Sequence, residues 1–115
     1  MSNNLAQKNL GDIDVQSIAG AASTGTHGTG VTLGSVSTQI LEITLITAKG
    51  EIMVCSETQN KDIFKAAQVS LGTLGIITKI KLQLVPAYKL KYVRTKANLD
   101  DVSYTHLTLP TKRIV

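Results

Sequence analysis

A glycine- and threonine-rich stretch, residues 17–31, constrains the fold of this 115-residue chain more than any other feature. Its sequence, SIAGAASTGTHGTGV, has glycines at positions 20, 25, 28 and 30, several hydroxyl side chains and no charged residue. Glycine lets the backbone take positive φ angles and lets a ligand approach the peptide amides closely. Successive free N–H groups in such a turn form a concave anion site, to which Ser and Thr hydroxyls add donors. The stretch is therefore a candidate cradle for a phosphate or pyrophosphate.

The spacing of the glycines leaves a second interpretation open. Gly25, Gly28 and Gly30 do not follow the G-x-G-x-x-G pattern of dinucleotide-binding folds, and the Gly-Lys-Ser/Thr string of a P-loop does not follow them. The same residues would also serve as a flexible connection between two strands. His27 is a structural or surface histidine in this interpretation, and we expect it to make a hydrogen bond within the loop.

Composition narrows the class of protein. Hydrophobic residues make up 43% of the chain but aromatic residues only 3%, so a modest core of Ile, Leu, Val and Ala is expected. The net charge of +4 comes mainly from residues 79–96 and the last residues, which favours solvated basic strand faces over nucleic-acid binding. Cys55 is the single cysteine, so it predicts no internal disulfide and no metal site, and it is expected to be buried.

Strands are predicted where β-branched residues are dense or where polarity alternates. Residues 40–47 are typical of a buried strand, and residues 52–55 are expected to pair back on it through a turn that Gly50 permits. Residues 76–85 alternate between apolar and basic side chains, which is typical of a half-buried strand, and Pro86 is expected to end it. Two further strands are expected at 13–18 and at 88–94.

One helix is expected at about residues 61–70. Asn60 is the predicted N-cap, with its side-chain oxygen accepting a backbone N–H, and Asp62 favours the positive end of the helix. The predicted buried stripe consists of Ile63, Ala67 and Ser70, with Phe64 and Leu71 beside it. The order of strand, glycine-rich loop, hairpin, helix and strand predicts an α+β fold rather than regular βαβ units.

Several separated strings in the chain resemble one known family, in the same order. They are DVQSIAG at 14–20, STGTHGTG at 23–30, LGSVSTQ at 33–39, QVSLGTLGIIT at 68–78 and VPAY at 85–88. Together they resemble the flavin-binding segment of the sugar-1,4-lactone oxidase group, which includes L-gulonolactone oxidase, D-arabinono-1,4-lactone oxidase and alditol oxidase. This group lies within the vanillyl-alcohol oxidase family, whose FAD-binding domain is of the p-cresol methylhydroxylase (PCMH) type.

The resemblance implies a fold and a set of cofactor contacts. The chain would be the second subdomain of a PCMH-type FAD-binding domain, an α+β unit with a mixed sheet and few helices. FAD would place its pyrophosphate against the glycine-rich loop, its adenosine end against the backbone of Ile76 or Ile77, and its reactive ring and the substrate near Ser17. The positions that match cofactor-binding residues of the family are Ser17, Ser23, Gly25, Thr26, His27, Gly28, Thr29, Gly30, Ile76 and Ile77.

The resemblance also implies an activity. The expected reaction is the FAD-dependent oxidation of a CH–OH group in a sugar-1,4-lactone or alditol, with oxygen as acceptor and hydrogen peroxide as product. The family's covalent flavin histidine lies in an upstream Gly-His-Ser segment, so His27 is not expected to attach the flavin. The acid–base residues of the family lie in a C-terminal cap domain, so no catalytic residue is named here. The alternative is a non-catalytic nucleotide- or anion-binding module.

The resemblance ends near residues 96–100 and divides the chain. Residues 1–100 are expected to form a partial FAD-binding domain, and residues 101–115 resemble a translated sequencing adapter rather than native sequence. The chain is thus expected to be a fragment that lacks the N-terminal FAD subdomain and the cap domain, and to be inactive alone. A cytoplasmic location is expected because no leader is visible, while membrane association, known among relatives, leaves no mark in the sequence.

Overall fold

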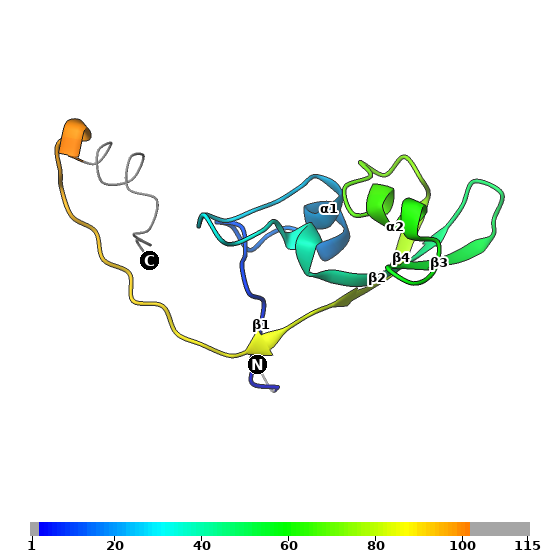
Figure 1. Cartoon of the computed structure of the whole chain (residues 1–115), viewed down its shortest axis with the longest axis horizontal. Coiled ribbons are helices and arrows are strands. Elements are labelled where there is room, and N and C mark those ends of the chain that lie inside the picture. Colours follow the sequence, from blue (N-terminus) through cyan, green and yellow to red (C-terminus); the bar gives the residue numbers. More distant parts are fainter. Residues whose placement is uncertain (1–2, 102–115) are drawn as a thin grey trace.

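The computed structural model describes residues 3–101 and is built around a three-stranded sheet (Figure 1). The central strand β2 (Ile40–Ile46) pairs with β3 (Ile52–Ser56) on one side and with β4 (Ile76–Leu82) on the other. Both pairings are antiparallel. The turn between β2 and β3 closes through the Gly50 N–H, which donates to Thr47 O at 2.9 Å. The predicted hairpin and the following strand are confirmed, although β4 ends at Leu82, earlier than expected.

The core lies between this sheet and two short helices. Ile43 and Leu45 of β2 and Cys55 of β3 are at most 2% exposed. Phe64 and Ala22 come from the two helices and join the same cluster. Full burial of a side chain such as Leu or Phe stabilises the folded state by about 1.5–3 kcal/mol, so this small cluster carries much of the stability. The predicted burial of Cys55 is confirmed.

A helix, not a strand, leads into the glycine-rich loop. Residues 18–23 form α1 (Ile18–Ser23), and Ser17 is its extended N-cap, whose hydroxyl accepts the Gly20 N–H at 3.4 Å. The strand predicted at 13–18 is therefore wrong. Ile13 and Val15 alternate with polar residues as a strand would, but they are 61% and 81% exposed and pair with no strand among the described residues. A short 3₁₀ helix η1 (Val36–Gln39) then leads into β2.

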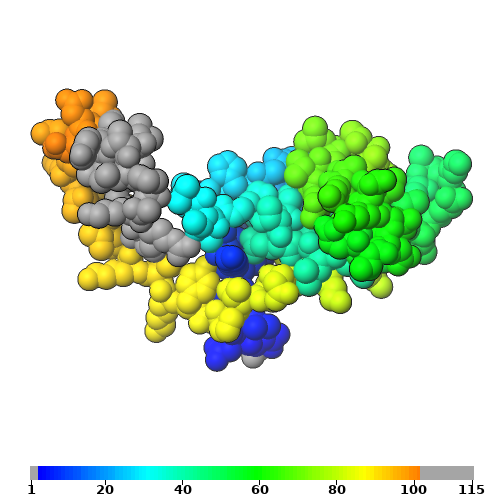
Figure 2. Space-filling model, in the orientation of Figure 1, coloured from blue at the N-terminus to red at the C-terminus, as the bar shows by residue number. Residues whose placement is uncertain are grey.

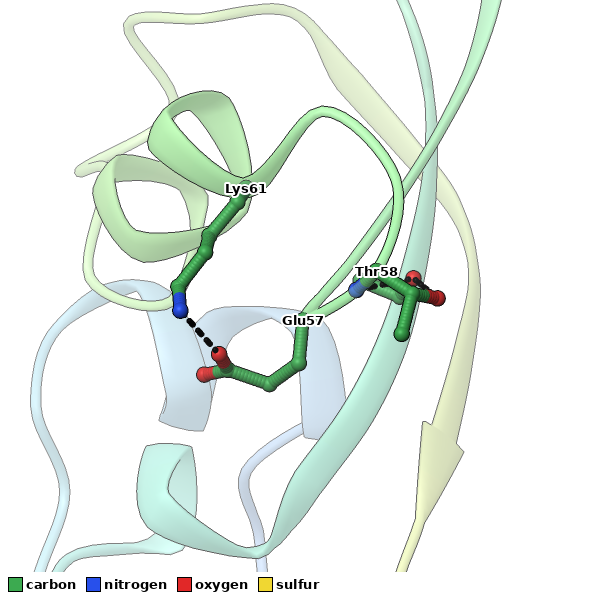
Figure 3. A network of polar contacts seen from close by, with 4 residues as sticks. Glu57, Thr58 and Lys61 are labelled. Carbon is green, nitrogen blue, oxygen red and sulfur yellow. Dashed lines mark hydrogen bonds and ion pairs between the residues drawn. The ribbon is translucent and has the colours of Figure 1, made fainter.

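The predicted helix after β3 is confirmed as α2 (Lys61–Ala67), shorter than expected. Asn60 is the N-cap residue, as predicted, but it lies in the left-handed region, at φ 50° and ψ 47°, and its side chain does not make the predicted capping hydrogen bond. Its side-chain Nδ2 instead donates to Val54 O of β3 at 2.8 Å. The buried stripe is also shifted, because Phe64 is 1% exposed while Ile63 is 38% exposed. An ion pair of 3.3 Å joins Lys61 to Glu57 on the surface (Figure 3).

A second, two-stranded sheet joins residues 5–6 near the N-terminus to residues 85–86. In it, β1 (Leu5–Ala6) pairs antiparallel with β5 (Val85–Pro86). Pro86 therefore lies in a strand rather than simply ending one. Beyond it, the strand expected at 88–94 is absent, and the backbone extends away from the body of the molecule as an arm (Figures 1 and 2).

These elements confirm the α+β class with few helices. The strand pairs within residues 3–101 are all antiparallel, and β2 lies at the centre of the main sheet. In this part of the chain no helix has the length and apolar character needed to cross a membrane. The adapter-like segment lies outside the described residues except for its first position, Asp101, so the proposed division at residue 100 stays a prediction.

Candidate functional site

The glycine-rich loop follows α1 and turns back towards η1. Gly25 has φ +70° and Gly30 has φ +126°, so two of the expected cradle glycines take conformations that other residues rarely adopt. The start of the loop is fixed by backbone hydrogen bonds: Thr26 N–H donates to Ala21 O, and Thr26 O accepts from Val36 N–H, both at 2.9 Å. The loop is therefore anchored between a helix and the entrance to the central strand.

The loop leaves a run of backbone donors open. The N–H groups of Thr24, Gly25 and Thr26 are satisfied by carbonyls of α1. From residue 27 to residue 31, by contrast, no backbone N–H donates to another group of the described chain. Successive unpaired N–H groups around positive-φ glycines are the arrangement that binds anions in backbone nests. Residues 27–31 therefore form the open part of the predicted cradle.

The side chains of the loop divide into two sets. Thr26 Oγ1 is bonded to the side-chain amide of Gln16, at 3.0 Å to Nε2, so it is used within the loop. His27 Nδ1 lies 2.7 Å from Gly28 O and must donate, because a carbonyl oxygen only accepts. This is the local hydrogen bond expected of His27. The hydroxyls of Ser23 and Thr29 make no hydrogen bond within residues 3–101, so they remain available to a ligand.

Gly28 is needed for a reason that the sequence does not reveal. Its φ is not positive, but a Cβ at this position would overlap Leu10 O and would lie 2.7 Å from Asn9 Oδ1. The backbone of residues 9–10 thus presses directly on the loop. The absence of a side chain at Gly28 thus makes room for residues 9–10, whereas the sequence predicts that it makes room for a ligand.

The two isoleucines predicted at the adenosine end lie on β4. Ile77 is half-buried in the sheet, while Ile76 is 71% exposed and lines an open groove of about 480 Å³. Thr47 lines the same groove, and its buried Oγ1 has no hydrogen-bond partner among the described residues. An unpaired buried hydroxyl costs free energy. Sequence reasoning missed Thr47, which stands among β-branched strand residues.

The groove and the loop belong to neighbouring segments. Leu71 N–H, just before the groove residues 72–76, donates to Ser23 O at 3.0 Å, and Gly25 faces Val69. An anion cradle and an open groove with an unsatisfied hydroxyl are the features that a dinucleotide such as FAD requires. The residues present therefore fit the expected cofactor.

Metal-binding and nucleophilic groups were also considered among the described residues. No group of three His, Cys, Asp or Glu residues there is placed to hold a metal ion. Burial raises the pKa of the Cys55 thiol by desolvation, so it stays protonated and is a core residue rather than a nucleophile. Ser17 is exposed, but its hydroxyl caps α1, so a ligand at the predicted ring position would share that hydroxyl with the Gly20 N–H.

Comparisons with known proteins concern the chain as a whole. Residues 2–56 match the family described as FAD binding domain. The chain is 50% identical over 86 residues to D-arabinono-1,4-lactone oxidase from Yarrowia lipolytica, covering 75% of this chain and 16% of that protein. It is 41% identical over 98 residues to L-gulonolactone oxidase from Bos taurus, covering 85% and 22%. It is 48% identical over 86 residues to L-gulono-1,4-lactone dehydrogenase from Mycobacterium tuberculosis, covering 75% and 19%.

A solved structure extends the likeness to the fold. A VAO-type flavoprotein from Myceliophthora thermophila superimposes with a TM-score of 0.60 at 27% identity, covering 74% of this chain and 15% of that protein. The chain thus spans between about one seventh and one quarter of the length of these relatives. Its sequence is therefore similar to those of the sugar-1,4-lactone oxidases, and its fold is that of part of a VAO-type flavoprotein.

Proposed function

We propose that residues 1–100 form part of the FAD-binding domain of an oxidoreductase that oxidises a CH–OH group of a sugar-1,4-lactone. The observation that carries the proposal is the run of unpaired N–H groups at 27–31, in a loop with positive-φ glycines at 25 and 30. Its setting in a chain about 40–50% identical to lactone oxidases and a lactone dehydrogenase supports FAD as the ligand.

Each predicted residue takes a role that its surroundings support. The N–H groups of residues 27–31 bind the pyrophosphate, assisted by the Thr29 hydroxyl. Ser23 donates from the end of α1, and Ser17 lies at the start of the same helix, on the side proposed for the flavin ring and substrate. The exposed backbone near Ile76 and the unpaired Thr47 hydroxyl contact the adenosine end.

When bound, FAD would supply a two-electron acceptor for the oxidation of the CH–OH carbon, with oxygen as the proposed final acceptor and hydrogen peroxide as the product. The part of this chain is to bind and orient the cofactor. Relatives named as oxidases and as a dehydrogenase share this region, so the electron acceptor is set elsewhere in the whole protein. The groups that hold the lactone and move its proton are proposed to lie in a cap domain outside this chain.

A competition experiment on the purified 115-residue chain tests cofactor binding. Flavin fluorescence gives the affinity for FAD, and ADP and riboflavin are then added as competitors. If the loop binds the pyrophosphate, ADP displaces FAD and riboflavin does not. Binding that ADP cannot displace contradicts the pyrophosphate role, and ADP binding as tight as FAD binding supports the nucleotide-module alternative instead.

A pair of glycine variants locates the binding. Gly30→Ala places a side chain at φ +126° in the cradle, 3.0 Å from Leu33 Cδ1, and is expected to weaken FAD binding about tenfold, equivalent to about 1.4 kcal/mol. Gly50→Ala is the matched control, because Gly50 also has a positive φ but lies in the hairpin turn, where a Cβ would meet no atom within 4 Å. Equal loss of affinity in both variants would show that the effect is general destabilisation.

A further inference from the structure

We propose that Gln39 is a positioning residue for the glycine-rich loop. It acts through the backbone of residues 7–11, here called the N-terminal segment, and not through any contact with a ligand. The inference rests on the proposed FAD function, because it explains how the cradle keeps its shape. It concerns a residue that neither the sequence motifs nor the resemblance assigned to the site.

The Gln39 side chain is buried and uses both ends of its amide. It is 7% exposed, its Oε1 accepts the Lys8 N–H at 3.2 Å, and its Nε2 donates to Asn9 O at 2.8 Å. A buried amide with both ends satisfied has one orientation, so it fixes the segment at this point.

Gln39 is itself held by the main sheet. It ends η1 directly before the central strand β2, and its carbonyl accepts the Gln83 N–H at 2.7 Å, just beyond β4. The side chain therefore projects from the junction between η1 and the main sheet. Three further contacts hold the N-terminal segment: Asn9 Nδ2 donates to Gly34 O at 3.3 Å, and the Tyr88 hydroxyl lies 3.1 Å from the carbonyls of both Gln7 and Lys8.

The N-terminal segment presses on the loop at two places. A Cβ on Gly28 would overlap Leu10 O, and a Cβ on Gly11 would lie 2.8 Å from Thr26 Cγ2. Gly28 is among the open donors at 27–31, so the position of Leu10 O sets the backbone path of the cradle. A path of contacts thus runs from the sheet through Gln39 and Leu10 to Gly28.

The test compares Gln39→Met with a matched control in the 115-residue chain. Met has a similar length but cannot form either hydrogen bond, so the N-terminal segment loses its attachment. Gln68→Met is the control, because Gln68 is half-buried and donates to a backbone carbonyl of η1, that of Ser37, but does not contact the N-terminal segment. The two readouts are the affinity for FAD and the ¹H–¹⁵N NMR signal of the Gly28 amide.

We expect Gln39→Met to weaken FAD binding about tenfold and to shift the Gly28 signal, and Gln68→Met to do neither. A merely structural role would shift signals throughout the core in both variants. If the wild-type chain binds FAD and Gln39→Met binds it equally well, the inference is overturned. If the wild-type chain binds no FAD, the proposed function fails for this chain, and the Gly28 signal alone decides whether Gln39 positions the loop.

A second variant covers the case in which Gln39→Met does not fold. Tyr88→Phe removes the surface contact with Gln7 and Lys8, and because Tyr88 is 49% exposed the core is left intact. It is expected to shift the Gly28 signal from its wild-type position, with a loss of FAD affinity of about twofold to threefold, as for one exposed hydrogen bond. A Gly28 signal identical to the wild type in Tyr88→Phe would then overturn the inference.

Discussion

Replacing Gly75 by alanine tests how the loop before β4 is joined to the central strand. Gly75 has φ +145°, and a Cβ there would overlap Ile46 O and would lie 3.1 Å from Ile46 C. Ile46 is the last residue of β2 and pairs with Ile76, the first residue of β4. The substitution therefore strains its own backbone and also pushes the partner strand away.

The two effects have different magnitudes. A non-glycine residue in this region of φ costs about 1–3 kcal/mol. To restore an ordinary contact, the Ile46 carbonyl must move by about 1 Å, which weakens a hydrogen bond at the end of the ladder and adds about 0.5–1.5 kcal/mol. We therefore expect Gly75→Ala to lower the free energy of unfolding by about 2–4 kcal/mol, a large part of the roughly 5–15 kcal/mol typical of a folded domain.

Gly72→Ala in the same loop is the control. Gly72 has φ +75°, and a methyl group there would meet no atom within 4 Å, so only the backbone cost of about 1–2 kcal/mol applies. Urea denaturation followed by far-ultraviolet circular dichroism at room temperature measures both variants. If Gly75→Ala loses no more stability than Gly72→Ala, the steric argument is refuted and strand pairing does not depend on this close approach.

Three further predictions concern the β3–α2 region. The Cys55 thiol, with its pKa raised by burial, should resist iodoacetamide in the native chain and react in urea. The stability that the buried neutral thiol contributes is complete below the unfolded thiol pKa of about 8.5 and is lost as the pH rises towards the folded pKa. A series of urea unfolding midpoints at increasing pH would show this loss. Asn60→Gly should destabilise by about 1 kcal/mol through loss of the bond to Val54 O, and Asn60→Ala by more, because alanine is also strained at φ 50°; equal losses in urea denaturation would contradict this. Glu57→Gln should change the free energy of unfolding by less than about 0.5 kcal/mol at any salt concentration, because its ion pair with Lys61 is exposed, and urea titrations at low and high salt would check it.

The main sheet could be predicted from the sequence because its signals are local. β2 is dense in β-branched residues, β4 alternates between apolar residues and lysines, and Gly50 marks the turn between β2 and β3. The residues within each strand are enough to indicate which of its side chains are buried. The strand expected at 13–18 failed because Ile13 and Val15 alternate without a partner strand to pair with, while the alanines after Ser17 favour a helix with a serine cap.

The glycine-rich loop of the site could be predicted from the sequence, but the residues that hold the loop in place could not. The loop and its positive-φ glycines follow from the glycine spacing, whereas the need for Gly28 depends on Leu10, which is distant in sequence. The capping bond predicted for the Asn60 side chain fails for a similar reason, since its actual partner, Val54 O, belongs to the preceding strand. The roles of Gln39 and Thr47 could not be predicted, because a buried amide and an unpaired hydroxyl are recognised only when their neighbours are known.

The pairing of β1 with β5, here called the clasp, affects the order in which the molecule folds. It joins residues about 80 apart, as the Tyr88–Gln7 contact shows, whereas the β2–β3 hairpin closes a turn of only a few residues. Closing the longer loop costs roughly 2–3 kcal/mol more chain entropy, so the clasp forms after the hairpin and opens before it. The N-terminal segment, which contacts Gly28 of the loop, follows β1 directly. We therefore expect the loop to gain its anion-binding shape late in folding and to lose it early in unfolding, while the main sheet is still intact.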